Sequence, residues 1–101
     1  METRIFKIIR ESFRDSDLAE AGRLLAGGWL VAFPTETVYG LGASLEDGAA
    51  VRKLLEITDS PSDRRLTLHM SHVLEMSRWV REVPPAARRL MRKFWPGPLT
   101  L

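Results

Sequence analysis

The chain has 101 residues, of which 45% are hydrophobic and 28% are charged. This length allows one domain with a modest core, and the composition is typical of a globular protein. There is no cysteine, which excludes disulfides and thiolate chemistry, and no apolar run is long enough for a signal peptide or a membrane span. We therefore expect a single cytoplasmic domain over residues 1–101, with no membrane partner.

The net charge of +2 is unevenly distributed along the chain. Residues 1–63 hold 7 basic and 11 acidic side chains, whereas residues 64–101 hold 8 basic and 2 acidic side chains. A basic C-terminal part favours an anionic partner such as a nucleotide or a nucleic acid. A solvated helix face is the commoner explanation of such a charge run, so both interpretations stay open.

The first elements predicted along the chain are a short strand over residues 5–9 and a helix after it. Residues 15–17 (Asp-Ser-Asp) are candidates for the helix N-cap, and the next apolar residues recur at helical spacing. The glycine pair at 27–28 is expected to end this helix.

The next segment, residues 28–42, reads as a buried strand that breaks into a polar loop. Residues 29–33 are an uninterrupted apolar run, typical of a strand covered on both faces, and Pro34 removes a ladder donor. The loop then offers hydroxyl and carboxyl oxygens, and Gly40 and Gly42 allow backbone conformations closed to other residues. A ligand-binding loop and a plain strand-to-turn boundary both fit this pattern.

The remainder of the chain continues the alternation of helices and strands. Asp47 opens a predicted helix, residues 58–65 form a polar loop, and residues 66–70 alternate as a strand. Further helices are predicted from the apolar spacing of Val73, Met76 and Val80, and from Pro84 and Pro85 onward. We expect an α/β fold in which a twisted, open, mixed sheet is flanked by helices.

Three motifs stand out: residues 34–42 (PTETVYGLG), residues 61–63 (PSD) followed by residues 66–69 (LTLH), and residues 94–101 (FWPGPLTL). They resemble the motifs of the YrdC-like (YrdC/YciO) family, the threonylcarbamoyl-AMP synthases of tRNA modification. The resemblance covers nearly the whole chain and implies a YrdC-like fold. Family members continue well beyond the third motif, so the chain corresponds to the N-terminal part of the family domain, truncated at the C-terminus.

The resemblance implies an activity in which threonine, bicarbonate and ATP give threonylcarbamoyl-AMP and pyrophosphate. ATP is then a substrate, Mg²⁺ is expected with it, and the product serves tRNA threonylcarbamoyladenosine formation with tRNA and tRNA-modification proteins as partners. Such a site must recognise a small amino acid, neutralise a triphosphate and hold the reacting atoms in line. The sequence contains no glycine-rich phosphate loop of either standard kind.

The resemblance assigns threonine binding to Thr35 and His69. Thr35 matches the family threonine that contacts the amino acid, although a loop hydroxyl that bonds its own backbone fits the same position. His69 matches the family histidine on the same side of the site, and a histidine with one satisfied hydrogen bond is the alternative. Tyr39 is a candidate cover for the pocket and equally a candidate core residue. A metal site at His69 and His72 lacks a third ligand, so no metal site is predicted.

The central loop departs from the family pattern Lys-x-Arg-Pro-Ser-x-Asn, in which the lysine and arginine meet phosphates. Aligned through Pro61, this chain has Thr58 for the lysine, Ser60 for the arginine and Arg64 for the asparagine. A hydroxyl donates one hydrogen bond to a phosphate but adds no charge. We assign these three residues to the nucleotide end of the site and expect weak or no activity from this chain, unless Arg64 and Arg65 restore the charge.

Two alternatives to an enzyme follow from the same residues. One is an RNA-binding module, including double-stranded RNA, in which the helix rows formed by Arg88 with Arg92 and by Arg89 with Lys93 contact phosphates. The other is a regulatory relative that keeps the fold without catalysis. Residues 99–101 begin what looks like a further strand, and an unpaired sheet edge there would favour self-association.

Overall fold

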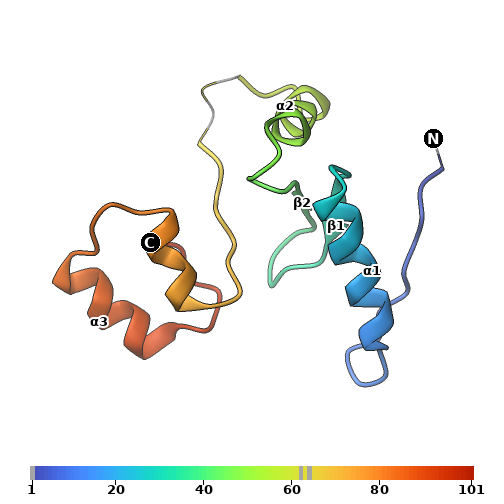
Figure 1. The fold of residues 1–101 in the computed structure, drawn as a ribbon. Helices are drawn as coiled ribbons and strands as arrows, with labels where there is room; N and C mark the ends of the chain where they lie inside the picture. Colours follow the sequence, from blue (N-terminus) through green and yellow to red (C-terminus); the bar gives the residue numbers. More distant parts are fainter. Residues whose placement is uncertain (1, 62, 64) are drawn as a thin grey trace. The chain divides into compact units, whose positions relative to one another are not determined.

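The computed structural model describes residues 2–61, 63 and 65–101. The chain forms two compact units, the first unit (Met1–Arg64) and the second unit (Arg65–Leu101). The first unit contains two helices and a pair of strands, drawn from blue to green in Figure 1, and the second unit contains two helices drawn in orange and red. Each unit is described by itself. No helix of the described residues is both long enough and apolar enough to cross a membrane.

Helix α1 (Asp15–Ala26) opens the regular structure of the first unit. Asp15 and Asp17 lie in its first turn and Arg23 in its last, which matches the direction of the helix dipole. The helix ends as predicted at the glycine pair, where the Gly27 N–H donates to the Arg23 carbonyl over 2.9 Å and the Gly28 N–H donates to the Leu25 carbonyl over 3.0 Å.

Strands β1 (Val31–Phe33) and β2 (Gly40–Gly42) form an antiparallel hairpin, with Phe33 opposite Gly40 and Val31 opposite Gly42. Strand β1 ends at Pro34 as predicted. The prediction that both faces of this strand are covered is wrong, because Ala32 is exposed and its neighbours are half-buried. Strand β1 has one partner strand in a two-stranded sheet, and that leaves a face open to solvent.

Helix α2 (Gly48–Ile57) begins at Asp47, as the sequence predicts. The Asp47 carboxylate accepts hydrogen bonds from the Ala49 N–H at 3.0 Å and the Ala50 N–H at 3.1 Å, which satisfies two of the N–H groups that a helix start leaves unpaired. Ala50 and Leu54, one turn apart, are 3% and 8% exposed and form the buried face of this helix.

The second unit consists of an extended segment, the 3₁₀ helix η1 (Val73–Arg78) and helix α3 (Pro85–Phe94). His72 caps η1, since its Nδ1 accepts from the Leu74 N–H at 3.1 Å. Proline at the first position starts α3 as predicted, because its missing N–H would have no helical partner there. After α3, the Trp95 indole N–H donates to the Leu99 carbonyl over 2.8 Å and closes the C-terminal turn.

The predicted fold class is confirmed only in its coarser part, a combination of helices and strands. Among the described residues the sheet has two antiparallel strands, so the prediction of a larger mixed sheet is wrong for this part of the domain. Residues 5–9, 66–70 and 99–101 are not strands here. A strand is defined by hydrogen bonds to a neighbour, and the described residues offer these three segments no ladder partner. The helix predicted around Val73 is present as the 3₁₀ helix η1.

The core of the described residues is small. Ala50, Leu54 and Met91 are the buried apolar residues, the last at 9% exposure. Many large apolar side chains are exposed, with Ile5 at 90% and Leu74 at 77%. Stability therefore depends strongly on local contacts such as helix caps and turns.

Substitution of Gly28 by alanine tests one such turn. Gly28 has φ +87°, and a Cβ atom there would lie 2.7 Å from Oδ2 of Asp47, the residue that caps α2. We expect Gly28→Ala to lower the free energy of unfolding by about 1–3 kcal/mol, measured by urea denaturation.

The matched control is Gly22→Ala, in the middle of α1. A Cβ atom at this position meets nothing within 4 Å. Because alanine is the better helix former, this variant should be more stable by about 0.5–1 kcal/mol. Equal effects of the two substitutions would show that neither the positive φ nor the contact with Asp47 constrains residue 28.

Candidate functional site

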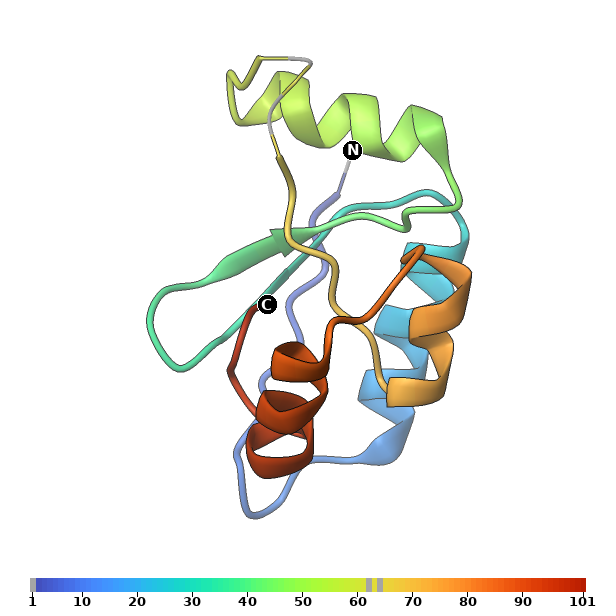
Figure 2. The same cartoon turned by 90° about the vertical axis from the view of Figure 1, so that its left-hand side faces the viewer.

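The loop of residues 34–39 joins β1 to β2 and is held by the Thr35 side chain. The Thr35 hydroxyl donates to the Val38 carbonyl and accepts from the Thr37 N–H at 3.2 Å. Figure 2 shows the loop at the free end of the hairpin. This is the local bonding that the sequence left open as an alternative for Thr35. The predicted contact with threonine stays a prediction.

The residues around Thr35 in this loop are all exposed to solvent. Tyr39 is 78% exposed and Val38 74%, so the interpretation of Tyr39 as a core residue is wrong. Its other interpretation, a side chain that covers a ligand, remains a prediction. Glu36 is exposed as well. The loop thus presents hydroxyl, carboxylate and phenol groups together on one exposed turn.

The two glycines that end the motif have a role that the sequence did not indicate. The one described glycine with a positive φ is Gly28, so Gly40 and Gly42 do not use a conformation closed to other residues. Instead, the ring of Phe33 lies where their side chains would be, 2.9 Å from a Cβ at Gly40 and 3.0 Å from one at Gly42. Small residues are needed here because of a cross-strand contact, a signal that spacing alone does not carry.

The central loop begins at the end of α2, where Thr58 and Ser60 bond to each other. The Thr58 hydroxyl lies 2.8 Å from the Leu54 carbonyl, to which it donates, and 2.9 Å from the Ser60 hydroxyl. The structure therefore brings these two predicted nucleotide residues together, as part of the helix C-terminus. The third predicted residue, Arg64, lies outside the described residues, and Arg65 is exposed.

His69 lies in the extended segment of the second unit and is exposed. Thr35 and His69 thus belong to different units. The ring of His72 has a structural use, the cap of η1, and the described residues contain no group of three or more histidine, aspartate or glutamate side chains that could hold a metal ion.

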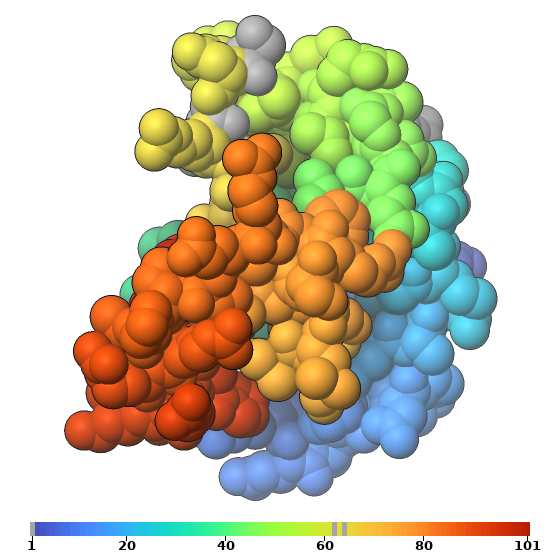
Figure 3. Space-filling model, turned by 60° about the vertical axis from the view of Figure 1, so that its left-hand side comes forward, coloured from blue at the N-terminus to red at the C-terminus, as the bar shows by residue number. Residues whose placement is uncertain are grey.

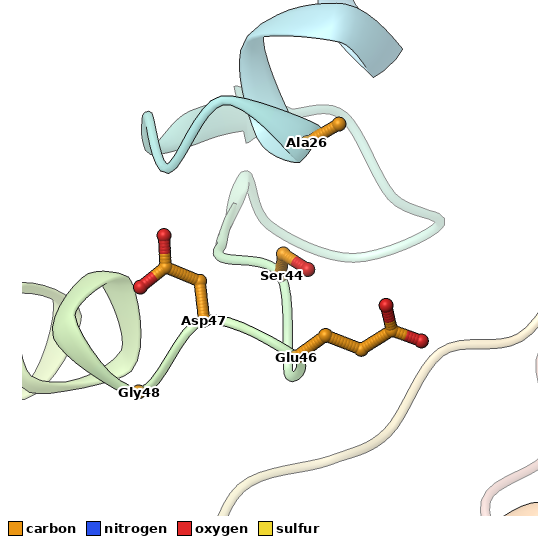
Figure 4. A pocket seen from close by; sticks show the side chains of 5 residues that line it. All are labelled: Ala26, Ser44, Glu46, Asp47 and Gly48. Carbon is orange, nitrogen blue, oxygen red and sulfur yellow. The ribbon is translucent and has the colours of Figure 1, made fainter.

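A hollow of about 450 Å³ lies between the end of α1 and the start of α2. Its lining residues are Ala26, Ser44, Glu46, Asp47 and Gly48. Figure 4 shows the Asp47 side chain directed toward the end of α1, whereas Glu46 points away from it. Two carboxylates repel a phosphate, and one of them already caps α2, so this hollow does not fit the triphosphate of a nucleotide.

A second hollow of about 680 Å³ lies in the second unit, along η1 and α3. Apolar side chains such as Met76, Val83 and Met91 line it, together with the charged residues Arg81 and Arg88. Figure 3 shows atoms of η1 in yellow-orange and of α3 in deeper orange on the surface that faces the viewer. The spacing of Val73, Met76 and Val80 predicted a helix in this unit, but the sequence did not predict a hollow along it.

The four basic residues predicted to contact RNA lie on α3. Arg88, Arg89, Arg92 and Lys93 are all exposed. One of these four, Lys93, lies 5.4 Å from the Phe94 ring, and a further cation of the second unit, Arg78 at the end of η1, lies 5.3 Å from the Trp79 ring. This geometry is compatible with contacts to phosphates and equally with a solvated helix.

Comparison with known proteins identifies the family. The family model of Sua5, YciO and YrdC proteins, described as "Telomere recombination", matches residues 23–101. The match includes the threonine-rich hairpin loop, the central loop and the C-terminal turn whose geometry is described above. The chain belongs to this family.

Its relatives include threonylcarbamoyl-AMP synthases. The chain is 43% identical to the enzyme of Bacillus subtilis over 90 residues. The aligned region makes up 89% of this chain and 26% of that protein. It is 41% identical over 93 residues to the enzyme of Pyrococcus abyssi, over 92% of this chain and 27% of that protein. The chain thus spans about a quarter of the length of these relatives.

Two solved structures of Sua5 from Pyrococcus abyssi share the fold. One, a double variant, has a TM-score of 0.81 and 39% identity, over 87% of this chain and 27% of that one. The other, a complex with L-threonine, has a TM-score of 0.80 and 37% identity, over 85% of this chain and 25% of that one. The predicted YrdC-like family is therefore confirmed, and the structure of this chain matches part of the Sua5 structures.

Proposed function

We propose that this chain supplies the threonine-recognition part of a threonylcarbamoyl-AMP synthase domain. The domain would act in the cytoplasm and join threonine, bicarbonate and ATP, with Mg²⁺, for threonylcarbamoyladenosine formation in tRNA. The observation that carries the proposal is the likeness, at 37% identity, to a Sua5 structure that is a complex with L-threonine. The chain spans about a quarter of that protein. The complete reaction is therefore proposed for the domain of which this chain is a part.

In the proposed reaction, the amino group of threonine first adds to bicarbonate with loss of water, which gives a carbamate. A carbamate oxygen then attacks the α-phosphorus of ATP, the bond to the bridging oxygen breaks, and pyrophosphate leaves. Thr35 and His69 would bind threonine, and Thr58, Ser60 and Arg64 would lie at the phosphate end. Little covalent chemistry falls to the protein, whose tasks are positioning and charge neutralisation.

The central loop is the reason to expect weak turnover from this chain. The Thr58 hydroxyl donates to the Leu54 carbonyl and lies 2.9 Å from that of Ser60, so its single proton is already used at the helix end. A lysine and an arginine at these positions would add two positive charges. The strong contacts to phosphate are those of charged donors, and neither hydroxyl supplies a charge.

We propose RNA binding as a second function, on the observation that all four basic residues of α3 are exposed. Double-stranded RNA is the expected class, because its phosphates can be contacted without reading base sequence. A non-catalytic regulatory relative would keep this surface while the central loop loses its cations.

We also propose self-association through the open edges of the hairpin. The sheet has two strands, so each of them carries an outer row of N–H and C=O groups that another strand could pair.

Direct detection of product tests the enzymatic proposal. The chain is incubated with threonine, bicarbonate, ATP and Mg²⁺, and threonylcarbamoyl-AMP is measured by mass spectrometry. We expect little or no product, and more product from the double variant Thr58→Lys, Ser60→Arg, because two cations return to the phosphate end. A gain of about tenfold corresponds to 1.4 kcal/mol of transition-state stabilisation.

The matched control is the double variant Ser16→Lys, Ala19→Arg, which adds the same two charges at exposed positions of α1, outside the three motifs. An equal gain from this control would show that general positive charge, and not the central loop, is responsible. No product from any variant, together with no detectable threonine binding by the chain, would contradict the proposed function.

The RNA proposal is tested by fluorescence anisotropy with an RNA duplex at several salt concentrations. We expect two double variants to weaken binding: Arg88→Ala with Arg92→Ala, and Arg89→Ala with Lys93→Ala. Each lost phosphate contact should reduce the slope of log K against log salt by about one. The control Lys7→Ala, Arg10→Ala removes two exposed cations of the first unit and should leave binding unchanged. Equal losses from all three pairs would leave α3 without a specific role.

Light scattering over a range of protein concentrations tests self-association. We expect the average mass to rise toward that of a dimer, and Leu41→Lys on β2 to suppress the rise, because charged side chains on an edge strand oppose pairing. A constant monomer mass at high concentration would contradict this proposal.

A further inference from the structure

The ring of Phe33 occupies the space above two glycines of the neighbouring strand. A Cβ atom at Gly40 would lie 2.9 Å from both Cε2 and Cζ of this ring, and one at Gly42 would lie 3.0 Å from Cε1. Real Cβ atoms essentially never approach other carbons as closely as 2.9 Å, so Gly40→Ala would displace the ring, whereas the 3.0 Å contact at Gly42 is tight and needs a smaller shift of the ring. An aromatic side chain that covers a cross-strand glycine is a known way to stabilise a sheet.

The strand register explains why both glycines meet the same ring. Phe33 is directly opposite Gly40, and Gly42, two residues further along, is on the same face of β2. Leu41 lies between them on the other face, opposite Ala32. A slip of one residue would put Leu41 in place of a glycine across from the ring. The pattern Gly-x-Gly therefore favours the observed register over a slip of one residue, which would place the ring against Leu41.

This contact lies at the base of the loop that carries Thr35. Phe33 is the last residue before the loop and Gly40 the first residue after it, so the ring joins the two ends. Residues 34–39 are all exposed, and inside the loop the Thr35 hydroxyl bonds to the Thr37 N–H, the Thr37 hydroxyl and the Val38 carbonyl. Those bonds fix the shape of the loop, whereas its attachment to the hairpin fixes where the loop points.

We propose that Phe33 is a positioning residue for threonine recognition, acting through Gly40 and Gly42 on the loop that carries Thr35. The inference rests on the proposed function for the identity of the ligand. It also assigns the two glycines a packing role, in which they receive the Phe33 ring and do not contact phosphate. The ring needs no contact with the substrate to have this effect.

The experiment enlarges the side chain at one position of the contact and shortens it at the other. The whole chain is then studied by NMR spectroscopy. Gly40→Ala adds a methyl group against the ring, and Phe33→Leu removes the ring. We expect Gly40→Ala to shift the Thr37 and Val38 amide resonances and to weaken threonine binding by about tenfold. The double variant Phe33→Leu, Gly40→Ala should recover most of this loss, because the smaller side chain leaves room for the methyl group.

Two controls separate positioning from general stability. Leu41→Ala, between the glycines but on the opposite face, should leave the Thr37 amide resonance and the threonine affinity unchanged. Phe33→Tyr keeps the ring and should behave like the unmodified chain. The unfolding midpoint is measured for each variant, and only variants that are folded at the titration temperature are compared.

The outcomes distinguish this inference from the proposed function. If Gly40→Ala and Leu41→Ala have the same effect on the loop resonances, or if the double variant shows additive losses, the positioning role of Phe33 is wrong. If the unmodified chain binds no threonine while the loop resonances follow the expected pattern, the packing role of the glycines stands and the proposed function fails.

Discussion

Backbone pairing is the constraint on which the rest of this structure depends. A strand is stable when its N–H and C=O groups meet those of a neighbour, and the described residues provide one such pair, β1 with β2. Other extended segments, such as residues 66–70, have apolar side chains exposed to solvent, including Leu66 and Leu68. The helices then carry the few buried residues, and the candidate site is divided among loops next to them.

Local features of the sequence were sufficient to predict the helices. The Asp47 cap, the proline at the start of α3 and the glycines after α1 act within one turn of the residues that they constrain. Strands differ because their partners lie elsewhere in the chain. An apolar run such as residues 29–33 indicates a preference for burial, but whether a second layer covers the strand depends on residues outside the run.

The candidate site divides in the same way. The three motifs together predicted the family, and the bonding of Thr35 within its own loop was one of two interpretations that the sequence allowed. The reason for Gly40 and Gly42 could not be read from their spacing, because it lies across the hairpin in the Phe33 ring. Sequence reasoning assigned the glycines a conformational role, whereas the contact shows that space is what they provide.

The hydroxyl pair of Thr58 and Ser60 has a consequence for how such loops diverge between relatives. Each hydroxyl is a neighbour of the other, and that of Thr58 also closes the last turn of α2. A single change to a cation at either position removes the bond between them, yet restores one charge of the two that the family pattern has. The intermediate would thus have neither the complete helix end nor the complete cationic loop. The two positions are therefore coupled, and the effects of changing one of them depend on which residue occupies the other.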